Sequence, residues 1–256
     1  MTGGAPLDIN SWGLRVLKWL YGVCGMVDLA TAVAIAIYMR NVPDVPVKTA
    51  NPQTTKNLPA FLFPFLAVLF RFLQSAICAR YFDSYMRSCA GSVRWVKWTA
   101  TFVADPCLYC TILYSVGEGD AYTLTMMFVL VSFMSVLGAA YDYFRTKDPL
   151  ISALALFLDI YILFSCIGVI ADIFRNNQEY YDGESNSVIS ALVAILIVYQ
   201  VLLVLGMISS LILKESMPYV KSEYTSLLAT CIATECICVI QTVAVLARSE
   251  AGDNTP

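Results

Sequence analysis

Histidine is absent from the 256 residues of this chain, and charged residues are scarce, at 14% of the total. The missing imidazole excludes a Ser-His-Asp triad and removes the side chain that most often changes charge near neutral pH. The sequence also lacks a GxSxG motif, a phosphate-binding loop and an internal repeat of fixed period. A net charge of −3 provides no basic surface for nucleic acid. We therefore expect neither an enzyme nor a nucleic-acid-binding protein.

Apolar residues, in contrast, make up 59% of the chain, and its mean hydropathy is +0.69. This composition is typical of a multi-pass protein of the lipid bilayer. Seven runs are long enough to cross about 30 Å of hydrocarbon, namely 18–39, 58–79, 93–116, 121–144, 149–173, 187–213 and 224–247. The connections are short, and no other segment is long enough to fold alone. The sequence predicts one all-α domain over residues 1–256, a bundle of seven transmembrane helices.

The distribution of Lys and Arg predicts the orientation of this bundle. One side carries nine of them, namely Arg15, Lys18, Arg80, Arg87, Arg94, Arg145, Lys147, Lys214 and Lys221. The other side carries five, namely Arg40, Lys48, Lys56, Arg175 and Arg248. We therefore expect a cytoplasmic amino terminus and an extracellular or lumenal carboxyl terminus. The first eleven residues are polar and lack a basic region, so we expect no cleaved signal peptide.

Two residues of opposite charge, Lys97 and Glu235, lie inside otherwise apolar predicted helices. A charge within the bilayer is costly, so each marks a candidate functional site. The simplest hypothesis is a structural salt bridge between the third and seventh spans. Loss of one partner would then leave an uncompensated buried charge, at a cost of about 3–5 kcal/mol.

The motifs around these two residues resemble those of the heliorhodopsin family. The run Arg94-Trp95-Val96-Lys97-Trp98 is similar to the family's Arg-Trp-x-Glu-Tyr, in which the Glu is the Schiff-base counterion. The segment EYTSLLATCIATECICVIQ is similar to the family's seventh helix, with Glu235 in place of the retinal-binding Lys and Gln241 six positions later. The resemblance extends more weakly over all seven spans and includes the inverted orientation.

This resemblance implies a rhodopsin-like fold, a homodimer and a light-sensing ancestry, with the usual retinal attachment lost. Glu235 cannot form a Schiff base, and Lys97 stands where the family has its acid, so the pair is exchanged. The main hypothesis is a non-enzymatic protein of sensing or interaction. In a second hypothesis, Lys97 binds retinal and Glu235 is the counterion, with aromatic residues such as Trp98 and Tyr199 lining the pocket. A third is an ion or small-molecule transporter.

A second group of polar residues lies within the spans. Asp28 and Arg71 are predicted to pair, and the resemblance places Arg71 where the family usually has His. Asp105 and Asp159 are candidate carboxylate relay groups. Eight of the nine cysteines fall within spans, and the motif Cys107-x-x-Cys110 has neither His nor a second such motif beside it. We expect packing cysteines and no metal site.

Overall fold

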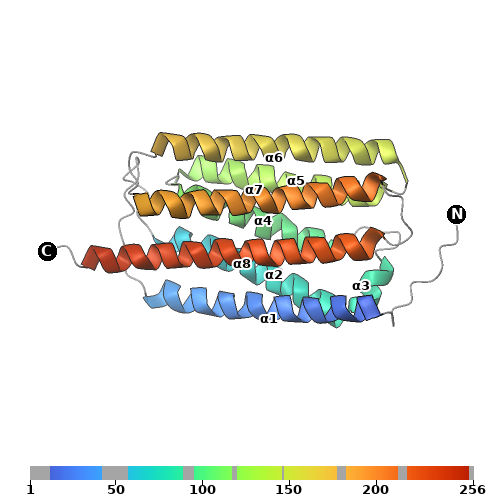
Figure 1. The fold of residues 1–256 in the computed structure, drawn as a ribbon, viewed down its shortest axis with the longest axis horizontal. Helices are drawn as coiled ribbons and strands as arrows, with labels where there is room; N and C mark the ends of the chain where they lie inside the picture. The colour runs from blue at the N-terminus through green and yellow to red at the C-terminus, as the bar shows by residue number, and fades with distance from the viewer. Residues whose placement is uncertain are drawn as a thin grey trace.

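The computed structural model describes residues 12–41, 57–88, 95–116, 120–145, 147–177, 183–212 and 218–253. These residues form helices throughout, namely α1 (Trp12–Asn41), α2 (Asn57–Arg80), α3 (Phe82–Ser88), α4 (Trp95–Ser115), α5 (Ala121–Phe144), α6 (Pro149–Asn177), α7 (Gly183–Ile212) and α8 (Pro218–Asp253). All except the short α3 run along the long axis of the molecule (Figure 1).

The long helices form a closed ring. Helix α1 packs on α2, α2 on α4, α4 on α5, α5 on α6, α6 on α7, α7 on α8, and α8 again on α1. Helices α1, α8, α7 and α6 form the near face in Figure 1, while α2, α4 and α5 lie behind them. The all-helical prediction is confirmed. Helices α1 and α8 start at the same end of the bundle and run parallel.

Six of the described helices are long and apolar enough to cross a membrane, namely α1, α2, α5, α6, α7 and α8. Helix α4, which belongs to the predicted third span, is not among them. At about 1.5 Å per residue its 21 residues would still reach roughly 31 Å. Its lower apolar character comes from polar residues such as Lys97, Thr101 and Asp105. The polar side chains of α4 thus contribute to the interior of the ring.

Local sequence explains several details of these helices. Asp120 caps α5 by accepting a hydrogen bond from the backbone N–H of Thr123 at 3.0 Å. Pro106 lies inside α4 and has no N–H to donate to the carbonyl of Phe102, four residues earlier. The hydroxyl of Ser132 on α5 donates to that carbonyl instead, at 3.1 Å. The α4–α5 contact therefore satisfies the carbonyl that the proline leaves without a helical partner.

The predicted boundaries differ most from the structure at three places. Helix α1 begins at Trp12 rather than near Lys18, and α8 extends from Pro218 to Asp253, beyond the predicted 224–247. Part of the connection between the second and third spans is the helix α3. Its Phe82, Tyr85 and Met86 are buried against α1 and the start of α8. Hydropathy missed this helix because its seven residues, about two turns, are too few to register as a span.

Candidate functional site

A cavity lies inside the half of the bundle where α1, α4 and α8 begin. It holds about 1250 Å³ of space, including the part open to solvent. Residues from all seven long helices line it. Those with charged or phenolic side chains are Tyr21, Asp28, Arg71, Lys97, Asp105, Tyr141, Asp142, Arg145, Asp159, Tyr199 and Glu223. The cavity thus contains both signs of charge within an otherwise apolar protein.

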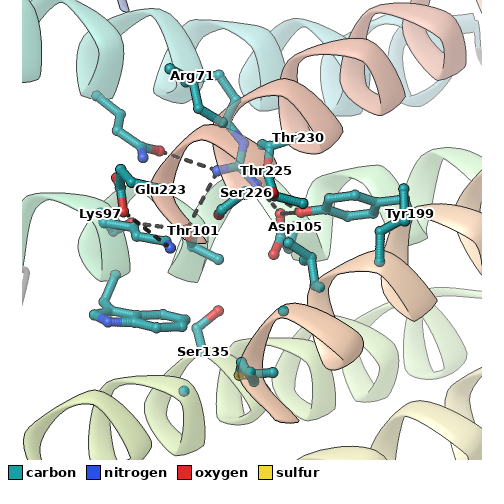
Figure 2. A pocket seen from close by; sticks show the side chains of 18 of the residues that line it. Arg71, Lys97, Thr101, Asp105, Ser135, Tyr199, Glu223, Thr225, Ser226 and Thr230 are labelled. Atoms are coloured by element: carbon teal, nitrogen blue, oxygen red, sulfur yellow. Dashed lines mark hydrogen bonds and ion pairs between the residues drawn. The ribbon is translucent and has the colours of Figure 1, made fainter. Parts of the chain in front are cut away.

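Lys97 and Glu223 form one side of this cavity. The ammonium Nζ of Lys97 lies 4.0 Å from the carboxylate Oε2 of Glu223, and Figure 2 shows the two side chains pointing toward each other. Glu223 is only 2% exposed. Its Oε1 accepts hydrogen bonds from the hydroxyls of Tyr21 and Tyr85, the latter at 2.8 Å. This carboxylate therefore connects α1, α3, α4 and α8 at the end of the bundle.

Arg71 and Asp105 form a buried ion pair further into the bundle. The other terminal nitrogen of Arg71 donates to Gln74 at 3.1 Å and reaches Thr101 at 3.4 Å. The hydroxyl of Tyr199 lies 3.4 Å from Asp105, and Figure 2 shows both on the same side of the cavity. Buried ions need both a counter-charge and hydrogen bonds, and this network supplies them to the two terminal nitrogens of Arg71, while its Nε has no hydrogen-bond partner.

Trp98 forms part of the cavity wall between α4 and α5. Its indole Nε1 donates to Asp142 Oδ2 at 2.8 Å. The ring packs on Gly138, where an added Cβ would overlap it. A glycine is thus required at this position because the indole occupies the space of a side chain. The Nζ of Lys97 lies 5.4 Å from the ring centroid of Trp98, within the range of a cation–π contact.

The structure corrects the predicted pairing of Lys97 with Glu235. The ion-pair partner of Lys97 is Glu223. Lys97 lies in the first turn of α4, level with the start of α8, whereas Glu235 follows Glu223 by twelve residues, or about 18 Å along the helix. The lysine side chain does not span that distance. Glu235 also does not line the cavity; it accepts a hydrogen bond from Thr31 on α1.

The predicted pair of Asp28 and Arg71 is also corrected, because Arg71 pairs with Asp105. Asp28 is close to Glu235 instead, within hydrogen-bonding reach. Asp159 lines the cavity, as do Trp98 and Tyr199. Gln241 lies elsewhere, and its amide oxygen accepts a hydrogen bond from Ser115.

Glu223 is the main residue that sequence reasoning did not assign to the site. The signal was present, since an acidic residue just before an apolar run can face the bundle rather than solvent. Only the packing of α3 and α1 against the start of α8 buries it. Among the described residues, no group of three or more Cys, Asp or Glu is placed to hold a metal ion.

Comparison with solved structures identifies the fold. The chain superposes on Exiguobacterium sibiricum rhodopsin with a TM-score of 0.75 and 9% identity, covering 93% of this chain and 99% of that one. For xanthorhodopsin, a light-driven ion pump with dual chromophore, the TM-score is 0.74 at 10% identity, with 94% and 96% covered. The light-driven proton pump LR (Mac) of Leptosphaeria maculans gives 0.71 at 10% identity, with 91% and 96% covered.

The protein has the fold of the microbial rhodopsins. No family model matches the sequence, and no curated protein is similar to it by sequence. The rhodopsin-like fold and the multi-pass membrane character predicted from sequence are therefore confirmed. Identities of 9–10% establish the fold alone. The function has to be inferred from the residues that line the cavity.

Proposed function

We propose that this protein is a non-enzymatic membrane sensor that binds a small amphipathic ligand in its cavity. The observation that carries this proposal is the mixed character of the cavity wall. Lys97, Glu223 and the Arg71–Asp105 pair provide charged groups. Apolar side chains line other parts of the wall together with Trp98, namely Val131, Met134, Leu202, Leu203 and Met207. Ligand pockets combine an apolar lining with a few polar groups in this way.

A second candidate function is photoreception with retinal bound through Lys97. The heliorhodopsin-like attachment on the last helix does not fit, because Glu235 carries a carboxyl group and does not line the cavity. Lys97 does fit: among the described lysines it alone lines the cavity, and Trp98 lies beside it. Bound retinal would supply the absorption of visible light. In this arrangement Glu223, not Glu235, is the carboxylate next to the attachment residue.

Two retinoids distinguish these candidates. Purified protein is incubated with all-trans-retinal, which can condense with an amine, or with all-trans-retinol, which cannot. Noncovalent binding predicts quenching of tryptophan fluorescence by both compounds and no red-shifted absorption band. Attachment to Lys97 predicts a band well to the red of free retinal, with retinal only, and its loss in Lys97→Ala.

The matched control for this experiment is Lys147→Ala. Lys147 lies outside the cavity, with its Nζ 3.6 Å from the ring centroid of Tyr143. It should leave both signals unchanged. The absence of quenching with either retinoid would exclude retinoid-shaped ligands from the cavity, and a band that survives Lys97→Ala would exclude attachment at Lys97.

Ion transport is the competing proposal, supported by the four aspartates Asp28, Asp105, Asp142 and Asp159 on the cavity wall. Liposomes containing the protein and a pH-sensitive dye would test it, in darkness and in light. A pH change that is lost in Asp159→Asn would favour transport over sensing. No change under either condition would favour the sensor.

We further propose that α4 crosses the membrane as the third of seven spans and that the amino terminus is cytoplasmic, as the loop charges indicate. The cavity would then lie toward the cytoplasmic side, where a sensor can contact a partner protein. A carboxyl-terminal fusion to alkaline phosphatase tests this orientation, since it should be active only outside the cytoplasm. A homodimer, expected from the heliorhodopsin resemblance, is testable by light scattering of the purified protein.

A further inference from the structure

A line of polar side chains crosses the contact between α1 and α8, outside the group formed by Lys97 and Glu223. The thiols of Cys24 and Cys231 contact each other at one height. One turn further along both helices, the carboxyl groups of Asp28 and Glu235 lie within hydrogen-bonding reach. Thr31 then donates to Oε2 of Glu235. Because α1 and α8 run parallel, residues four apart on each helix meet in register (Figure 1).

The two carboxyl groups have oxygen atoms without any donor. Asp28 is 2% exposed, and its Oδ1 has no hydrogen-bond partner. Oε1 of Glu235 is buried and has none either. A buried carboxylate oxygen that lacks both a donor and a cation is strongly destabilising. Two such oxygens on neighbouring side chains indicate that a small positive ligand is shared between them.

The charged and titratable groups around the pair do not neutralise it. From α2, Arg71 faces Asp28, but its terminal nitrogens already donate to Asp105, Gln74 and Thr101. The other titratable groups that face the pair are thiols, namely Cys24 on α1 and Cys231 and Cys238 on α8. None of these supplies a positive charge. Two carboxylates in contact cannot both be ionised without one.

We propose that Asp28 and Glu235 bind one proton between them. The proton is held by an oxygen of one carboxyl group, which donates a hydrogen bond to an oxygen of the other, so the pair carries one negative charge instead of two. In the part of the chain that the structure describes, no group of three or more Cys, Asp or Glu is placed to hold a metal ion, so the two carboxyl groups offer a site for a proton. The bound proton is therefore shared by both carboxyl groups and is not assigned to either one, as in other coupled dyads.

The cavity provides the route to this site. Asp28 lines the cavity and Glu235 does not, so a proton from the cavity reaches Asp28 first and the α1–α8 contact second. Release of the proton leaves two adjacent carboxylates that repel each other across that contact. The pair thus acts as a proton-binding site whose occupancy controls how firmly α1 packs on α8, whatever ligand the rest of the cavity accepts.

Infrared spectroscopy of the purified full-length protein tests the proposal, because the C=O stretch of a protonated carboxyl group is separate from the carboxylate bands and shifts in D₂O. The difference between wild type and Asp28→Asn at neutral pH should contain one such band per chain. The difference between wild type and Glu235→Gln should contain the same band. The control Asp172→Asn, an exposed carboxylate on α6, should show none.

The pH dependence of unfolding provides an independent measurement. The folded pair holds a proton that the separated carboxyls release, so the unfolding equilibrium constant of the wild type should rise by up to about tenfold per pH unit. Glu235→Gln should reduce this slope by the contribution of one proton, because its amide donates to Asp28 at every pH. If Asp28→Asn does not fold, the unfolding slope of Glu235→Gln still tests the shared proton.

Three outcomes would overturn the proposal. The first is a difference between wild type and Glu235→Gln that lacks the carboxylic-acid band, because the proton would then belong to another residue. The second is an unfolding slope that is equal in wild type and Glu235→Gln. The third is a wild-type protein that lacks the band and is stabilised by sodium chloride but not by choline chloride, because the pair would then bind a cation.

Discussion

Replacing Asp105 by asparagine should be among the most damaging single changes in this protein. The substitution keeps the shape of the side chain and removes its charge, so the buried guanidinium of Arg71 loses its ion-pair partner and faces only Asp28, with which it forms no ion pair. Arg71 is 5% exposed, and its remaining contacts to Gln74 and Thr101 are neutral hydrogen bonds. Breaking one side of a buried ion pair costs about 3–5 kcal/mol. This corresponds to a rise of roughly 10²- to 10⁴-fold in the unfolding equilibrium constant.

The assay is reversible unfolding of the purified protein in mixed micelles, followed by far-ultraviolet circular dichroism. The double variant Arg71→Met with Asp105→Leu removes both charges and should be neutral or even more stable than wild type, since apolar replacements of buried pairs often are. The control Asp172→Asn, at an exposed position on α6, should change stability by less than about 0.5 kcal/mol.

The reasoning is refuted if Asp105→Asn costs less than about 1 kcal/mol. Such a value would mean that the Arg71 charge is solvated or is neutralised by another acid. It is also refuted if the double variant loses as much stability as the sum of the single variants, because the two residues would then not be coupled.

Three further predictions concern contacts around the cavity. Gly138→Ala should lower the free energy of unfolding by about 1–3 kcal/mol, because its Cβ overlaps the indole of Trp98. Thermal unfolding measures this change, and adding Trp98→Leu should recover the lost stability. Tyr85→Phe removes one hydrogen bond to Glu223 and should speed hydrogen exchange in α3 relative to α6; equal exchange in α3 would contradict it. Tyr141→Phe removes a bond of 2.7 Å to a carbonyl of α7 and should cost about 1 kcal/mol by denaturant unfolding, with no cost if the phenol is solvated instead.

Much of the fold could be read from the sequence, because apolar runs of membrane-spanning length leave few alternatives. A backbone in hydrocarbon must satisfy its own hydrogen bonds, so each run becomes a helix. The run at 93–116 shows where this reasoning is weakest. Lys97, Asp105 and Pro106 lower its apolar character. Inside the ring, however, Lys97 pairs with Glu223 and Asp105 with Arg71, and Ser132 donates to the Phe102 carbonyl that Pro106 leaves without a helical partner.

The buried ionisable residues could also be identified from the sequence, because a charged residue in an apolar run needs either an ion-pair partner or a functional role. Lys97, Arg71, Asp105 and Asp159 all line the cavity. Their pairing was not visible. Lys97 was matched to Glu235 by charge and by family resemblance, and both arguments ignore height along the helix.

Sequence by itself determined the class of the protein, the helices and the list of costly charges, because these depend on composition and on periodicity along one chain. Only the tertiary structure decided which charges meet, because that depends on where each helix begins and which neighbours it has. Because α8 begins beside the start of α4, Lys97 pairs with Glu223. The parallel packing of α1 on α8 brings the side chain of Asp28 next to that of Glu235, so two acidic groups lie in contact.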